Sequence, residues 1–219
     1  MLQTIIDVFN RGGVPVMLGI TLTFLASMII IIERSFRFWV TYDLPNSAGF
    51  VIQVQKMVMN NSIENAIRLC KKVDPKLLPF VLAQGLKKAN HSPEEVELAV
   101  EHAILAVTPK LTKGVGFLST TANVATLLGL LGTIFGLMHS FAAAAKATGS
   151  EKQTLLAEGI AEALTATSFG LGTALLCLFA YGVLAAKQKG LLDDINQHSA
   201  KLKELLYTRK NKIESSSAE

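Results

Sequence analysis

One stretch of this chain decides its fold: residues 114–145 have the sequence GVGFLSTTANVATLLGLLGTIFGLMHSFAAAA. The stretch contains no Asp, Glu, Lys or Arg, and His139 is its one ionisable group near neutral pH. A helix needs about 17–25 predominantly apolar residues to cross a bilayer, so this stretch is long enough to span one. The sequence therefore predicts a transmembrane helix here.

Two further uncharged blocks occur on either side of this stretch. Residues 12–32 end in four isoleucines, and residues 163–186 lie between Glu162 and Lys187. Each is long enough to span a bilayer, so we predict three transmembrane helices. The first block lacks the basic flank and the small-residue cleavage site of a secretory signal peptide, and we expect it to remain in the mature protein.

The composition supports a membrane protein and argues against other classes. Half of the 219 residues are hydrophobic and 17% are charged, whereas an average soluble domain has roughly 25% charged residues. This disfavours an ordinary water-soluble enzyme, and the apolar content excludes a disordered chain. The net charge of +4 requires no nucleic acid, because the basic residues flank the spans, where anionic lipids attract them. We predict an all-α integral membrane protein.

The basic residues beside the spans predict the topology, because Lys and Arg accumulate on the cytoplasmic side. The cytoplasmic set contains Arg34, Arg37, Lys110, Lys113, Lys187 and Lys189, and the opposite set contains Arg11, Lys146 and Lys152. We therefore predict an external segment at 1–11, transmembrane helices at 12–32, 114–141 and 159–186, a cytoplasmic helical segment at 33–113, an external loop at 142–158, and a cytoplasmic helical tail at 187–219.

Helix signals continue outside the spans. Apolar positions at helical spacing predict short helices within residues 62–70 and 77–86. Ser92 is a good N-cap, with Pro93 at the first helical position and Glu95 placed to complete a capping box. No firm stop signal follows, so we predict one helix that begins in the cytoplasm, bends near Pro109 and continues through the second span. The third span continues into the tail in the same way.

Small or hydroxylated residues recur three and four positions apart in the last two spans. Such a stripe either packs helices closely or lines a polar path, and the pattern leaves both interpretations open. At about 1.5 Å of rise per residue, Thr133 and Thr167 reach similar depths and are candidates for one polar site. The set comprises Thr126, Gly129, Gly132, Thr133, Gly136 and Ser140, followed by Ala163, Thr167, Gly170, Thr173 and Ala174.

Titratable groups are scarce within the spans. Glu162, at the start of the third span, is either a functional carboxylate or a favourable charge at a helix N-terminus. The chain has no phosphate-binding loop, HExxH, CxxC or credible Ser-His-acid set, so we predict no enzyme activity, catalytic residue, metal site or cofactor. Residues 114–138 and 165–186 contain no side chain that titrates near neutral pH. If protons cross here, a partner has to supply the deep carboxylate.

Two long motifs carry a specific resemblance. Residues 125–141, ATLLGLLGTIFGLMHSF, and residues 159–171, GIAEALTATSFGL, closely resemble the MotA/TolQ/ExbB proton-channel family. Three spans with a large cytoplasmic segment after the first resemble the TolQ/ExbB branch. The chain departs from the family at Thr126 and Leu176, where proline is common, and at Gly182, where asparagine is frequent.

The resemblance implies a ring of five subunits around the single membrane helices of two copies of a TolR- or ExbD-like partner. In that family the partner's membrane aspartate carries protons, and the flux powers TonB-type uptake, Tol-type envelope maintenance through TolA, or motility. The family's pore-lining threonines match Thr133 and Thr167, and its acidic residue in the third span matches Glu162. The implied location is the bacterial inner membrane, with a periplasmic N-terminus and a cytoplasmic C-terminus. The alternative is a non-conducting membrane scaffold.

Overall fold

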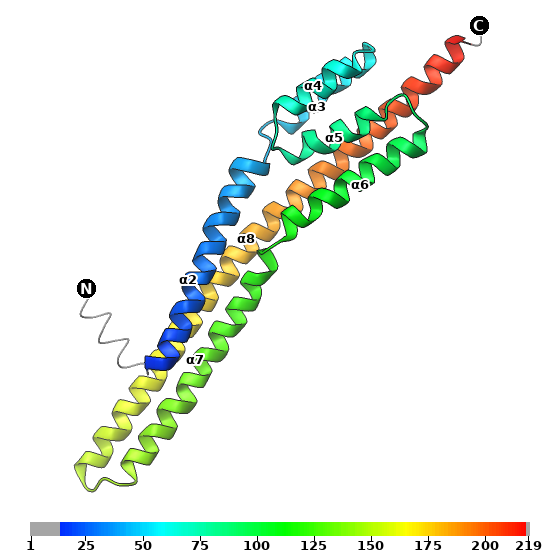
Figure 1. Cartoon of the computed structure of the whole chain (residues 1–219). Helices are drawn as coiled ribbons and strands as arrows, with labels where there is room; N and C mark the ends of the chain where they lie inside the picture. Colours follow the sequence, from blue (N-terminus) through cyan, green and yellow to red (C-terminus); the bar gives the residue numbers. More distant parts are fainter. Residues whose placement is uncertain (1–13, 218–219) are drawn as a thin grey trace. The chain divides into compact units, whose positions relative to one another are not determined.

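A computed structural model describes residues 14–217 of the chain. The predicted external segment at 1–11 and the last two residues of the predicted tail lie outside the described residues. Every element within residues 14–217 is helical, and Figure 1 shows the order of these elements along the chain. The elements are α2 (Val14–Phe36), the π-helical η1 (Arg37–Tyr42), α3 (Ser47–Met59), α4 (Ile63–Lys72), α5 (Leu77–Lys87), α6 (Pro93–Thr112), α7 (Val115–Ala144) and α8 (Ser150–Ser217).

The described chain forms two compact units. The apolar unit contains residues 14–34 and 114–183, and the polar unit contains residues 35–113 and 184–217. Helix α8 contributes to both units. Three helical stretches are long and apolar enough to cross a membrane, one in each of the regions Val14–Met59, Pro93–Ala144 and Ser150–Asn211. The structure is therefore that of an all-α protein with three candidate membrane-spanning helices, as predicted.

The prediction of one helix that continues from the cytoplasm through the second span is wrong. Pro109 lies inside α6, which continues to Thr112, and the helix is interrupted at Lys113 and Gly114. Gly114 has a φ of +83°, a left-handed conformation that glycine adopts without the steric cost of a Cβ. A Cβ at this position would also lie 3.1 Å from the Nε atom of Arg34. The break occurs at the glycine because proline costs one amide hydrogen bond, whereas a left-handed residue ends the helix.

A short connection joins the two longest helices of the apolar unit. Helix α7 ends at Ala144 and α8 begins at Ser150, so only residues 145–149 of the predicted loop at 142–158 are outside a helix. A connection of this length makes consecutive helices antiparallel neighbours, and Figure 1 shows α7 and α8 side by side. Most residues of the predicted stripes lie in the contact between these two helices.

The core of the polar unit confirms the two short helices predicted from apolar spacing. Helix α4 buries Ala66 and Cys70, and α5 is buried along most of its length. Burial raises the pKa of the Cys70 thiol to about 12, which keeps the thiol neutral and unreactive at physiological pH. Cys177 is also buried. Both cysteines are therefore free, buried thiols.

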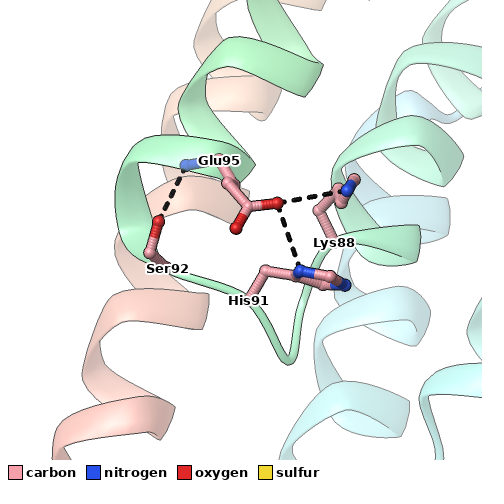
Figure 2. A network of polar contacts seen from close by, with 4 residues as sticks. All are labelled: Lys88, His91, Ser92 and Glu95. Carbon is pink, nitrogen blue, oxygen red and sulfur yellow. Dashed lines mark hydrogen bonds and ion pairs between the residues drawn. The ribbon is translucent and has the colours of Figure 1, made fainter.

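The predicted start of α6 is confirmed, but its capping box is half formed. The Ser92 hydroxyl accepts a hydrogen bond from the Glu95 backbone N–H at 3.3 Å, and Pro93 occupies the first helical position. The Glu95 side chain instead accepts from Lys88 Nζ and His91 Nδ1, each at 3.1 Å (Figure 2). The hydrogen bond from Lys88 is the main cause that lowers the pKa of the Glu95 carboxyl. The acid thus ties the α5–α6 turn to the first turn of α6.

Ser92→Ala is expected to destabilise the protein by about 0.5–2 kcal/mol, because the first turn of α6 loses its side-chain cap. Thermal unfolding of the purified protein in detergent measures this loss. Ser62→Ala is the matched control, since Ser62 occupies the N-cap position of α4 without making a side-chain cap hydrogen bond. An equal loss in both variants would contradict the assignment of the cap to Ser92.

Candidate polar site between α7 and α8

Glycine and alanine form the contact between α7 and α8. Gly129, Gly132 and Gly136 are buried on α7, and Ala163 and Gly170 are buried on α8. A Cβ on Gly136 would lie 3.1 Å from the Cβ of Ala163, and a Cβ on Gly132 would lie 2.5 Å from the Cβ of Ala166. The two backbones are therefore as close as small side chains permit, which is the usual packing of membrane helices.

The predicted stripes do not lie on one face. Thr126 is exposed, and its hydroxyl donates to the carbonyl of Ala122 on its own helix at 3.0 Å. Thr173 and Ala174 are buried on α8, and Ala174 packs in an apolar cluster with Ala125 of α7. The structure thus places Thr126 off the packing face and keeps the other small residues on it.

One hydrogen bond crosses between the helices at the level of the threonines. The Thr167 hydroxyl donates to the backbone carbonyl of Gly129 at 3.0 Å. In a regular α-helix that same carbonyl accepts the backbone amide of Thr133. The hydroxyl of Thr133 donates to the carbonyl of Leu130 at 2.6 Å. Both predicted threonines therefore meet at one turn of α7.

The hydroxyl oxygens of Thr133 and Thr167 can still accept hydrogen bonds. A threonine hydroxyl has one donor and two acceptor lone pairs, and here each donor is already directed at a backbone carbonyl. Both Thr133 and Thr167 are only partly buried. The pair therefore offers acceptor oxygens to a group that donates a proton, such as water or a protonated carboxyl.

A second interhelical hydrogen bond lies near the α7–α8 connection. The buried Ser140 hydroxyl donates to the backbone carbonyl of Leu155 at 3.1 Å. A Cβ on Gly159 would overlap the Ser140 side chain, so α8 needs a glycine there. Gly159 and Ala166 were absent from the predicted stripe, although the series 159, 163, 166 and 170 has the helical spacing that would have identified them.

Glu162 lies on α8 beside Ala163, at the border of the packing face, and is partly exposed. His139 of α7 is exposed. Within residues 14–217, no group of three or more His, Cys, Asp or Glu side chains is arranged to hold a metal ion. The structure therefore leaves Glu162 at the border of the packing face, on the same helix as Thr167.

Residues 73–197 match the model of the MotA/TolQ/ExbB proton channel family. This chain belongs to that family. Its relatives include a putative ExbB-like 3 biopolymer transport protein of Synechocystis, 32% identical over 84% of this chain and 87% of the relative. The ExbB biopolymer transport protein of Pseudomonas putida is 35% identical over 50% of this chain and 33% of its own length. The Tol-Pal system protein TolQ of Haemophilus influenzae is 35% identical over 57% of this chain and 49% of its own length.

The family assignment covers the whole candidate site. The matched region contains α7 and the part of α8 that packs against it, including Thr133, Glu162 and Thr167. Similarity to both ExbB and TolQ proteins confirms the TolQ/ExbB-like branch. The alignments span about a third of the Pseudomonas ExbB and half of the Haemophilus TolQ. With three apolar helices, this family member is an inner-membrane protein.

Helices α7 and α8 continue without interruption through the two positions at which proline is common in the family. Thr126 lies within α7 and Leu176 within α8, and neither helix is interrupted there. Both residues have the backbone amide that proline lacks, so the helical hydrogen bonds continue through these positions. A proline kink is therefore not part of the geometry of this site.

Proposed function

We propose that this protein is the proton-channel subunit of an inner-membrane motor that uses the proton motive force. The observation that supports the proposal is the hydrogen bond from Thr167 to the Gly129 carbonyl, which joins α8 to the turn of α7 that carries Thr133. The names of the relatives, biopolymer transport protein ExbB and Tol-Pal system protein TolQ, support a role in energised transport or envelope maintenance.

The protein itself lacks a deep carboxylate, so the moving proton needs a partner. Residues 114–138 and 165–186 contain no Asp or Glu. A TolR- or ExbD-like partner with one membrane helix supplies an aspartate, which donates to the free lone pairs of Thr133 and Thr167 when it is protonated. Glu162 lies on the outer side of the threonines and biases the access of protons from outside.

The assembly that fits this role is a pentamer around two copies of the partner. Its N-terminus is periplasmic, its polar unit and C-terminus are cytoplasmic, and α8 extends from the membrane into the cytoplasm. A proton that crosses a membrane potential of 100 mV releases about 2.3 kcal/mol. Work on a TonB- or TolA-like envelope protein therefore requires several protons in each cycle.

A non-conducting scaffold is the second candidate function. The close glycine packing of α7 on α8 favours it, because that packing holds helices together whether or not protons pass. In this alternative, the threonine hydroxyls only satisfy backbone carbonyls, and the polar unit recruits other proteins.

Proton flux into liposomes distinguishes the two functions. The full chain is reconstituted alone and with its single-span partner, and native mass is recorded on the same samples. The motor proposal predicts flux only with the partner, at a mass of about five subunits plus two. Flux that is absent from a stable complex carrying its envelope protein would favour the scaffold.

A further inference from the structure

The polar unit contains a cationic groove between the end of α4 and one face of α5. Three lysines line it, namely Lys71, Lys76 and Lys87, together with one acid, Asp74, and the ring of Phe80. Phe80 is 37% exposed, so the groove has an apolar surface between its charges. No residue of this groove belongs to the proposed proton path.

Two of the three lysines of the groove, Lys76 and Lys87, donate hydrogen bonds to neutral groups. Lys76 Nζ donates to the backbone carbonyl of Val40 at 2.8 Å and to that of Asp43. Lys87 Nζ donates to the amide oxygen of Gln84 at 3.1 Å. A neutral acceptor orients an ammonium group without cancelling its charge. The Asp43 carboxylate accepts from Lys187 at 2.6 Å instead, so the groove retains an excess of positive charge.

A further lysine extends the charge along the same surface. Lys110 Nζ lies 5.6 Å from the centroid of the Phe80 ring, a separation at which a cation is attracted to an aromatic face. Lys110 therefore places a fourth ammonium beside the aromatic part of the groove. Asp74 is the single acid among the residues that line it.

Two residues that contact the groove lie a few positions along the chain from the apolar helices. Val40, which Lys76 contacts, follows α2 by four residues, and Lys110 precedes Gly114 by four residues. Trp39 is 47% exposed and Val40 is 55% exposed, and exposed tryptophan is typical of the headgroup level of a bilayer. Lys187 Nζ lies 5.9 Å from the Trp39 ring centroid.

We propose that this groove binds the phosphate-bearing headgroup of an anionic phospholipid in the adjacent leaflet. Lysine ammonium groups bind phosphate as point charges, and basic pockets beside membrane helices bind anionic headgroups. Phe80 and Trp39 supply apolar surface for the part of the lipid next to the headgroup. Bound lipid would hold the α4–α5 hairpin at the membrane surface.

Trp39 is the single tryptophan of the chain and reports on nearby lipid. The full-length protein is placed in nanodiscs of phosphatidylcholine that contain either dibrominated phosphatidylglycerol or dibrominated phosphatidylcholine at equal mole fraction. Bromine quenches tryptophan fluorescence at short range. Stronger quenching by the phosphatidylglycerol is expected, and equal quenching by the two lipids would overturn the proposal.

The double variant Lys71→Gln/Lys87→Gln is expected to lower the apparent affinity for phosphatidylglycerol by about 25-fold, because each basic residue near an anionic surface contributes a factor of about five. Lys56→Gln/Lys201→Gln is the matched control, since both lysines are exposed and do not line the groove. The control is expected to retain the preference. An equal effect of both double variants would show that the lipid preference depends on the overall charge of the protein. That result would overturn the proposal that the groove binds the headgroup.

Inorganic phosphate distinguishes a lipid headgroup from a free anion. Millimolar phosphate is added to the phosphatidylglycerol nanodiscs, with chloride of equal ionic strength as the reference. The lipid proposal predicts the same quenching in both. If phosphate alone abolishes the preference, the groove is a site for a free phosphate compound and the lipid assignment is wrong.

Discussion

Thr167→Val is expected to abolish proton flux through the complex with the partner while leaving the complex assembled. Valine has nearly the shape of threonine but no hydroxyl, so the acceptor oxygen beside the partner's aspartate is lost. The Gly129 carbonyl that Thr167 contacts keeps its backbone amide donor within α7. The structural cost is therefore that of one interhelical hydrogen bond, about 0.6–2 kcal/mol.

Thr165→Val is the control for this experiment. Thr165 lies two residues away on the same helix, and its hydroxyl donates to the Ala161 carbonyl of α8 at 2.7 Å rather than to α7. Flux and native mass are measured for both variants in the same liposomes. Wild-type flux in Thr167→Val would remove the hydroxyl from the proposed path. Loss of flux in Thr165→Val alone would place the path on another face of α8.

Gly170→Ala is expected to destabilise the protein strongly. A Cβ at this position would lie 2.7 Å from the backbone oxygen of Ala125 and 2.8 Å from the Cα of Gly129. Both atoms belong to the backbone of α7 and have no side-chain rotamer by which to move away, so the helices have to separate. Overpacking of this kind costs typically 1–3 kcal/mol. Because Gly129 also accepts the Thr167 hydrogen bond, flux is expected to fall together with stability.

Gly172→Ala provides the comparison on the same helix. Gly172 has no atom within 4 Å of the position that a Cβ would occupy, so we expect a change within about 0.5 kcal/mol, the usual range for an unconstrained site. Thermal unfolding of both variants in the same detergent measures the difference. Equal destabilisation by the two substitutions would show that any alanine in this part of α8 lowers stability. It would contradict the explanation that the short distance between Gly170 and α7 causes the loss.

Part of the candidate site was predictable from the sequence. Similar depth suggested that Thr133 and Thr167 belong together, because rise per residue is constant in a helix whatever it packs against. The pairing of Thr167 with the Gly129 carbonyl was not predictable, because it depends on the distance between two backbones. The role of each threonine and of Glu162 stays a prediction until flux is measured.

The sequence by itself determined the class of the protein and the location of its three apolar helices. The absence of charge over a bilayer's thickness is a property of each segment alone, and the spacing of small residues marked the last two spans as candidates for close packing or for a polar path. Only the tertiary structure decided that Gly132 faces α8 whereas Thr126 does not, and that the helix ends before Gly114 instead of continuing into the second span. Residues three and four apart share a face, but the rotation of a helix against its neighbour selects which of them are buried.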